Sequence, residues 1–234
     1  MNDRTVLEIV DVVKSYGALR PLRLQALTLT SGERVTIGGL DAAAAELFVN
    51  LVTGATLPDT GQIRTFGRST ADITNAEEWL GSLDRFGIVT ERGVLLGDAT
   101  LMQNLAMPFT LEIDPVPDDV GRRVAALAEE CGIAADWLGE PAASVPPAVK
   151  ARTHLARAVA LGPALLLLEH PTASLDAGER TAFGLDAARL CETRAMAAVA
   201  ISGDQEFAAV FAPRGLTLQP ATGALVRQKR RWLW

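Results

Sequence analysis

The sequence has few of the residues that mark secreted, metal-binding or membrane-spanning proteins. Its two cysteines, Cys131 and Cys191, have neither the spacing of a metal site nor the number of a disulfide framework. They fit a reducing compartment, and we expect both to be small core residues. The first residues lack the basic and apolar pattern of a signal peptide, and no window reaches the roughly 20 apolar residues of a membrane span. We therefore expect a cytoplasmic chain that needs a separate partner for any work at a membrane.

The chain also lacks an excess of positive charge. Its formal net charge of −6 argues against non-specific nucleic-acid binding, so we expect no nucleic-acid partner. With 234 residues, of which 49% are hydrophobic, it suits one large globular domain. The one concentrated basic and aromatic segment is the tail at 227–234. This tail fits a contact with anionic lipid or a partner, and it fits a frayed terminus equally well.

The strongest structural signal is the apolar run Leu165–Leu168, which lies between Pro163 and Pro171. The run is too short for a helix and has no polar alternation, so it predicts a strand buried on both faces of a parallel sheet. Ligands bind at the carboxyl ends of such strands. Glu169 and His170 follow the run directly and are therefore candidate site residues.

Periodicity predicts the other elements. Alternation of apolar and polar residues indicates strands of an antiparallel unit at 6–12, 22–30 and 61–67. Short apolar runs indicate buried strands at 35–39, 86–89 and 197–202. Helical spacing occurs at 42–52, 76–84, 119–131, 150–160 and 177–193. A closing hairpin is expected around 222–223, between 216–219 and 224–226.

The block from Arg157 to Asp176 resembles the Walker B strand and D-loop of ABC-transporter ATPases. The matching residues are Arg157-Ala158, the Leu165–Leu168 strand, Pro171-Thr172 and Leu175-Asp176. The resemblance covers about residues 6–226 and is nearest to the lipoprotein- and macrolide-export types. It implies an α/β fold, a P-loop NTPase-like core with a mostly parallel sheet, an antiparallel β subdomain and a helical subdomain. The core and β subdomain would comprise 1–90 and 157–226, and the helical subdomain about 91–156.

In this family, the phosphate loop reads Gly-x-x-x-x-Gly-Lys-Ser, which falls here on Gly39, Ala44, Ala45 and Glu46. A working loop holds phosphates with bare backbone amides and a lysine, and it places a hydroxyl on Mg²⁺. Ala45 has no charge, and Glu46 sets a carboxylate near the anion. Asp41 before four alanines is a good N-cap. We therefore expect the helix to start a turn early and to fill the volume of the phosphates.

The other positions that the resemblance identifies are altered too. Those with a catalytic role in the family hold Glu91, Glu169, His170 and Gly203, and the signature motif is replaced by a segment with Pro146 and Pro147. The two prolines remove two amide donors. Glu91 is a candidate metal ligand, although a lone carboxylate is also an ordinary loop charge. Tyr16 matches the family's adenine-stacking aromatic residue, and a lone aromatic in a loop also serves as packing.

The resemblance therefore implies a catalytically inactive ABC domain with a structural or regulatory role and without a bound cofactor. Its partners would be a membrane permease subunit, a second ABC ATPase subunit, or both, in a homo- or heterodimer at the inner face of the cell membrane. Asp176 in the D-loop, and Asn104 and Pro108 in the helical subdomain, would supply the subunit contacts. One alternative is a divergent ATPase that binds ATP and Mg²⁺ through Glu91, Glu169 and His170. Another is a soluble binding module without a membrane partner.

Overall fold

The structure, a computed structural model, describes residues 5–90 and 92–227. Its strands are β1 (Thr5–Lys14), β2 (Leu22–Thr30), β3 (Arg34–Gly38), β4 (Thr60–Thr65), β5 (Arg68–Ser69), β6 (Phe86–Val89), β7 (Leu165–Glu169), β8 (Ala197–Ile201), β9 (Arg214–Gln219) and β10 (Ala224–Arg227). Its helices are α1 (Ala42–Val52), α2 (Ala76–Leu83), α3 (Leu101–Ala106), α4 (Asp118–Glu130), α5 (Pro147–Val159), α6 (Ala177–Thr193) and α7 (Gln205–Phe211), with single 3₁₀ turns at Thr70–Asp72 and Ala135–Trp137.

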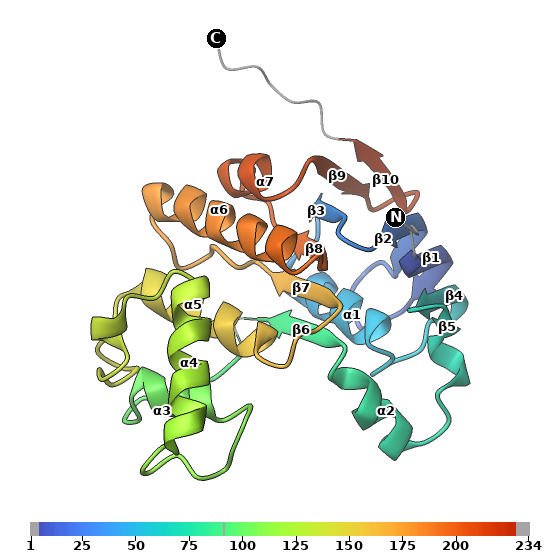
Figure 1. Cartoon of the computed structure of the whole chain (residues 1–234). Coiled ribbons are helices and arrows are strands. Elements are labelled where there is room, and N and C mark those ends of the chain that lie inside the picture. The colour runs from blue at the N-terminus through green and yellow to red at the C-terminus, as the bar shows by residue number, and fades with distance from the viewer. Residues whose placement is uncertain (1–4, 91, 228–234) are drawn as a thin grey trace.

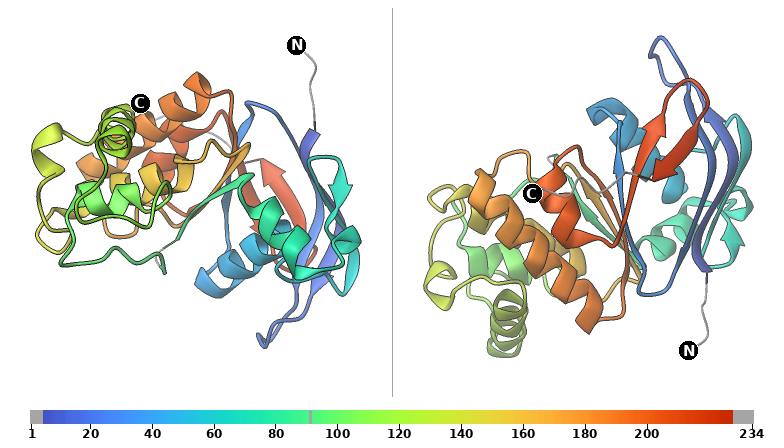
Figure 2. Two further views of the ribbon diagram at one scale, coloured as in Figure 1. Left: turned by 60° about the horizontal axis from the view of Figure 1, so that its bottom comes forward. Right: turned by 90° about the horizontal axis from the view of Figure 1, so that it is seen from above.

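Two sheets organise the fold (Figure 1). The larger has the strand order β10-β9-β3-β8-β7-β6 and is parallel except for the β9–β10 pair. The smaller, β2-β1-β4-β5, is antiparallel. Figure 2 shows that α1 and the smaller sheet lie on one side of the larger sheet, whereas α3 to α7 lie on the other. The larger sheet is therefore covered on both faces, as parallel sheets require.

The central strand β7 confirms the interpretation of the apolar run. All five of its residues are buried, and it pairs in parallel with β6 and β8. Its side chains alternate between two hydrophobic cores: Leu166 and Leu168 pack with the helices α3 to α7, and Leu165 and Leu167 pack with α1 and the smaller sheet. Each fully buried leucine contributes about 2 kcal/mol, so the run joins the two halves of the molecule.

Most predicted elements are confirmed within a few residues, including the antiparallel strands and the closing hairpin. Three elements, β5, α3 and α7, were not predicted from the sequence. The expected end of the helical subdomain at 156 falls inside α5, which continues to Val159. Within the described residues, no helix has both the length and the apolar character to cross a membrane.

Candidate functional site

Helix α1 begins at Ala42, three residues before Ala45, as its N-cap predicts. The carboxylate of Asp41 accepts a hydrogen bond of 2.8 Å from the amide of Ala44, and the carbonyl of Asp41 accepts one of 2.8 Å from the amide of Ala45. These amides correspond to the part of the loop that would hold phosphates, and both are engaged within the helix. These two amides of the first turn of α1 are thus hydrogen-bonded without a ligand.

Gly39 and Tyr16 lie beside this helix start. Gly39 has a φ of +87°, and a Cβ on it would lie 3.0 Å from the carbonyl oxygen of Leu218, so both the conformation and the space require glycine. Tyr16 is partly buried against the core cluster that contains α1. Burial, and next the charge of Asp41, raise the pKa of its phenol. The structure therefore brings Tyr16 near the N-terminus of α1.

A guanidinium joins two carboxylates at the carboxyl end of β7. Arg92 pairs with Glu46 on α1, and its Nη2 lies 2.9 Å from each carboxylate oxygen of Glu169. The hydroxyl of Thr90 donates a further hydrogen bond of 3.0 Å to Glu169. The side chains of Arg92 and Glu46 are about half exposed, whereas that of Glu169 is only 7% exposed. We call Glu46, Thr90, Arg92 and Glu169 the arginine clamp.

Glu169 experiences opposing influences in the arginine clamp. Its burial is the largest of these and raises its pKa above the usual range. The Thr90 hydroxyl and the Arg92 guanidinium lower the pKa, and the nearby charge of Glu46 raises it again. Two carboxylates share one guanidinium, so Arg92 alone cannot balance both negative charges. The hydrogen bond from Thr90 therefore supports the buried carboxylate of Glu169.

His170 and Gly203 meet in a second place, beside the ends of β7 and β8. They line a cavity of ≈ 290 Å³ together with Thr172, Ala173, Arg180, Ser202 and Asp204. His170 has a φ of +43°, and its Nε2 is buried with no hydrogen-bond partner among the described residues. Asp204 is occupied, since it accepts a hydrogen bond from Thr172 and caps α7. No hydrogen bond or ion pair among the described residues joins His170 to the arginine clamp. Its electrostatic interaction with Glu169 lowers the pKa of that carboxyl.

The residues at the signature and D-loop positions are exposed helix starts. Pro146 is the N-cap residue of α5 and Pro147 its first residue, and neither position makes a side-chain cap. Proline suits this place because the missing amide would be unpaired there anyway. Asp176 is exposed at the start of α6, and its amide donates a hydrogen bond of 3.3 Å to Glu179. Its role in a subunit contact stays a prediction.

Asn104 corrects one expectation. It is fully buried, and its amide nitrogen donates to the carbonyls of Leu96, Ala99 and Thr100 while its oxygen accepts from the amide of Leu96. A side chain that is enclosed and saturated in this way cannot contact a subunit; it fixes the loop before α3 instead. Pro108 is partly exposed and lines a separate cavity, so it remains available for contact.

Arg92 is the site residue that the sequence analysis missed. The candidate singled out in this segment was its neighbour Glu91, which lies outside the described residues, as do positions 228–234 of the basic tail. A signal was present, because Glu169 follows one buried strand and Arg92 follows the adjacent strand β6, so that the two lie at the same sheet edge. The pairing joins residues 46 and 77 positions apart, a separation at which sequence spacing carries no information.

The fold and the site define a class: an α/β domain with the fold of an ATP-binding cassette, in which helix α1 follows a glycine turn and the buried acidic end of β7 faces it. Over 97% of its length, the chain superposes with a TM-score of 0.78 on the dimeric structure of the ATP-binding cassette MJ0796 bound to ADP and Pi, at 20% identity. That likeness concerns the fold alone. No family model matches the chain.

Sequence comparison identifies the family. The chain is 31% identical over 216 residues to the lipoprotein-releasing system ATP-binding protein LolD of Alcanivorax borkumensis, covering 89% of this chain and 93% of that protein. It is also 31% identical over 173 residues to the methionine import ATP-binding protein MetN of Brucella abortus, covering 73% of this chain. The chain spans only 46% of the length of MetN. It belongs to the family of ABC transporter ATP-binding proteins.

Proposed function

We propose that this ABC cassette has lost ATP hydrolysis and serves as a structural or regulatory subunit of a transporter complex. The single observation that carries the proposal is the arginine clamp. In it, a side chain of the protein itself supplies the positive charge between Glu46 and Glu169, which a family ATPase would provide with a magnesium ion and a phosphate-binding lysine.

The residues present do not fit Mg²⁺ with ATP. The Ala45 side chain is fully buried and offers no charge to a phosphate. Glu46 would repel the phosphates, and releasing it from Arg92 would leave two carboxylates close together. The amides of Ala44 and Ala45 are already hydrogen-bonded to Asp41. Binding would have to break these contacts before it gained any of its own, so we derive no catalytic step for this chain.

His170 does not restore the reaction. A histidine can act as a general base, but it needs a water molecule directed at a phosphate. Gly203 offers no side chain in this cavity, and no residue of the arginine clamp lines it. A divergent ATPase is therefore the weaker proposal, and no bound cofactor is part of the proposed function.

The partners follow from the relatives. The solved cassette MJ0796 is dimeric, and the cassette CbiO1 is described as part of the ABC transporter complex CbiONQ. We propose the same two kinds of contact for this chain: a second cassette facing Asp176, and a membrane permease at the side that carries Pro108. The subunit would then lie at the inner face of the membrane, held there by the permease.

Titration calorimetry tests the loss of nucleotide binding. We expect no binding heat for ATP or ADP up to about 1 mM, with or without Mg²⁺. The matched control is a LolD-type relative, measured in the same buffer. A micromolar affinity for ATP in this chain would overturn the proposal, and so would phosphate release that disappears in a Glu169→Gln variant.

A further inference from the structure

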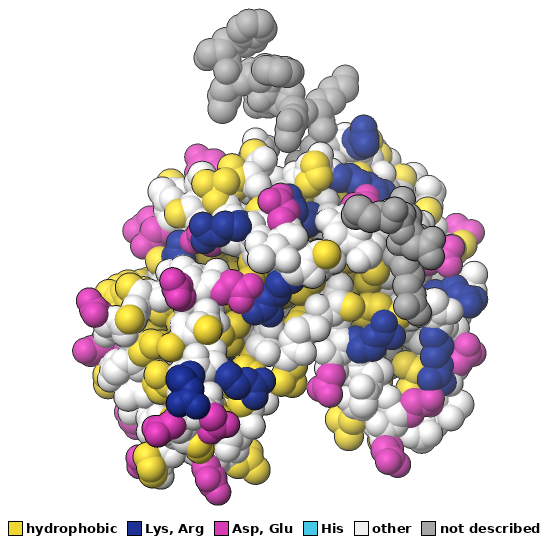
Figure 3. Space-filling view, in the orientation of Figure 1, with side chains coloured by type: hydrophobic (Ala, Val, Ile, Leu, Met, Phe, Trp, Pro, Cys, Tyr) yellow, Lys and Arg dark blue, Asp and Glu magenta, His cyan; other side chains and the backbone are white. Residues whose placement is uncertain are grey.

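The molecule has two lobes that pack on opposite faces of the larger sheet. We call residues 92–159, with α3, α4 and α5, the helical lobe; the other lobe carries α1, α2 and the smaller sheet. Figure 3 shows a hollow between the two. The helical lobe contributes to one hydrophobic core, whereas α1 and the smaller sheet contribute to the other. A direct bond between the lobes therefore has to pass around the edge of the sheet.

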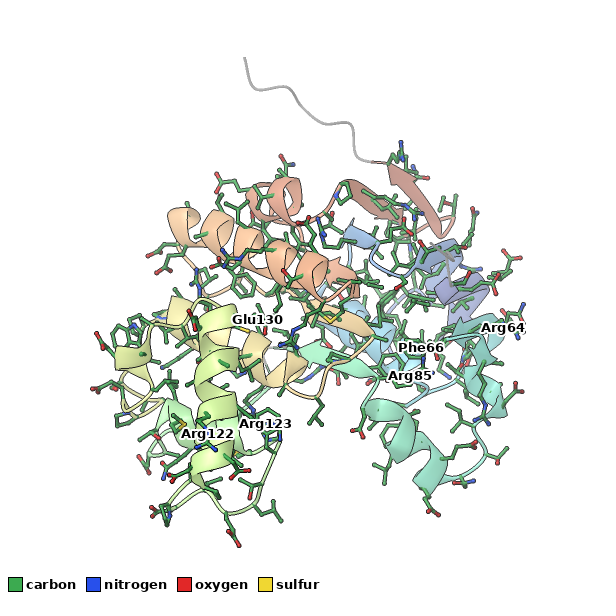
Figure 4. The ribbon with its side chains drawn as sticks, in the orientation of Figure 1. Arg64, Phe66, Arg85, Arg122, Arg123 and Glu130 are labelled. Atoms are coloured by element: carbon green, nitrogen blue, oxygen red, sulfur yellow. The ribbon has the colours of Figure 1, made fainter. Side chains whose placement is uncertain are left out.

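One end of the helical lobe is fixed to α6 by two ion pairs. Arg152 of α5 pairs at 2.7 Å with Asp186 of α6. Glu130, the last residue of α4, pairs with Arg194, which directly follows α6. Figure 4 shows Glu130 at the end of α4 that lies toward α6, and Arg122 nearer the opposite end. A rotation about this attachment would therefore move the Arg122 end of α4 the most.

The other attachment is the arginine clamp. Arg92 begins the helical lobe, and its guanidinium pairs with Glu46 of α1 and with Glu169 of β7. Among the ion pairs of the described residues, no other joins α1 to the helical lobe. The clamp thus passes around the carboxyl edge of the sheet, and one side chain links the lobe both to the sheet and to α1.

The segment that carries Arg92 is fixed to its own lobe. The carbonyl of Val94 accepts a hydrogen bond of 2.6 Å from Arg157 of α5. Leu96 exchanges two hydrogen bonds, of 2.8 and 3.0 Å, with the buried side chain of Asn104 on α3. A change in the position of Arg92 is therefore passed on to α3 and α5.

The two halves of the clamp differ in exposure. Glu169 is 7% exposed and also accepts a hydrogen bond from Thr90, whereas Arg92 and Glu46 are 48% and 47% exposed. Water and salt weaken exposed ion pairs much more than buried ones. The pair with Glu169 is therefore the more permanent half, and the contact with Glu46 is the half that opens first.

We propose that the arginine clamp is a latch that sets the angle between the helical lobe and the larger sheet, with the ion pairs on α6 as the hinge. The latch closes without a ligand, because the guanidinium and both carboxylates belong to the chain. This inference goes beyond the proposed function, since it concerns the orientation of a lobe and not the loss of nucleotide binding. It makes Arg92 a positioning residue for the whole surface of the helical lobe.

Double electron–electron resonance between two spin labels tests the latch on the full chain. Labels at Arg64→Cys on β4 and Arg122→Cys on α4 lie on different lobes, and both positions are exposed (Figure 4). The natural cysteines do not interfere, because burial raises the pKa of the Cys131 and Cys191 thiols to about 12. We expect one narrow distance distribution in the labelled parent chain and a broader one after Arg92→Ala.

Two further variants separate a latch from a local contact. If Arg92→Ala does not fold, as judged by circular dichroism, Glu46→Gln takes its place: it frees α1 from the clamp and should give a smaller broadening. The control Lys14→Ala removes the ion pair with Asp59, which lies within one lobe, and should leave the distribution unchanged. The parent distribution in the folded clamp variant would overturn the proposal, and so would equal broadening in the control.

Nucleotide titration of the same samples keeps the two proposals distinguishable. A parent chain that binds ATP fails the proposed function whatever its distance distribution. A parent chain that binds no ATP, and whose distribution stays narrow when the clamp is broken, fails only the present inference.

Discussion

Arg92 lies in the segment that follows β6 and Arg157 contacts that segment, yet the two guanidinium groups have different kinds of partner. Arg92 belongs to this segment and pairs with two carboxylates, Glu46 and Glu169. Arg157 reaches the same segment from α5, and among the described residues its guanidinium bonds the carbonyl of Val94 and no carboxylate. The carboxylates offset the cost of desolvating the Arg92 guanidinium. The Arg157 guanidinium is desolvated without a carboxylate to offset that cost. The charge of Arg92 is thus balanced within the chain, whereas that of Arg157 is not balanced by a carboxylate of the described residues.

Of the replacements considered, that of Arg92 should lower the free energy of unfolding the most. In Arg92→Ala, the buried carboxylate of Glu169 loses its cation and faces Glu46. We expect a loss of about 2 kcal/mol in the free energy of unfolding, less than a fully buried pair would cost because Arg92 is 48% exposed. Urea denaturation at pH 7 measures it, with the exposed Arg122→Ala as control. Equal stability of the two variants would show that the clamp contributes nothing.

A Glu169→Gln variant should differ from the wild type mainly in how its free energy of unfolding depends on pH. The folded state raises the pKa of Glu169, so the contribution of this carboxyl is present below its unfolded pKa and is lost as the pH rises through the folded value. The amide does not titrate. Relative to the variant, the wild type should therefore lose stability as the pH rises above the usual range of a free glutamate.

Thermal unfolding over a series of pH values, with Glu130→Gln as a reference, checks the sign. Glu130 is paired with Arg194, which lowers its pKa, so its contribution is instead lost as the pH falls. The two variants should therefore deviate from the wild type in opposite directions. Parallel pH profiles would contradict the opposite electrostatic environments of the two carboxylates.

Replacement of Arg157 should have the smallest effect on folding. Its loss removes one hydrogen bond to a carbonyl but also relieves the desolvation of a charge. We expect Arg157→Gln to change the free energy of unfolding by less than about 0.5 kcal/mol, measured beside Arg92→Ala. A loss as large as that of Arg92→Ala would make Arg157 a structural residue and weaken the contrast.

The elements around the site were accessible to sequence reasoning where local signals coincide. The Leu165–Leu168 run with its flanking prolines, and Asp41 before its alanines, each combine an apolar pattern with a boundary residue. Helix α7 was missed although Asp204 caps it and Phe207 and Phe211 lie on one face. Its seven residues are too few for a clear helical period.

The parts of the site that sequence could not supply depend on distant contacts. The arginine clamp joins α1, β7 and a loop, and only the fold brings these three segments together. Asn104 shows the converse error. A polar residue near a helix start is equally compatible with an exposed contact and with a buried loop anchor, and burial alone distinguishes them.

The capped first turn of α1 has a consequence for the proposed loss of hydrolysis. A lysine at position 45 would enter a fully buried position, where its charge would be costly without a partner. A serine at position 46 would deprive Arg92 of one counter-ion, while Asp41 would still hold the amide of Ala44. Each reversion by itself opposes the existing contacts. Under the proposed loss of hydrolysis, a single reversion would not restore the chemistry, and several coordinated replacements would be needed.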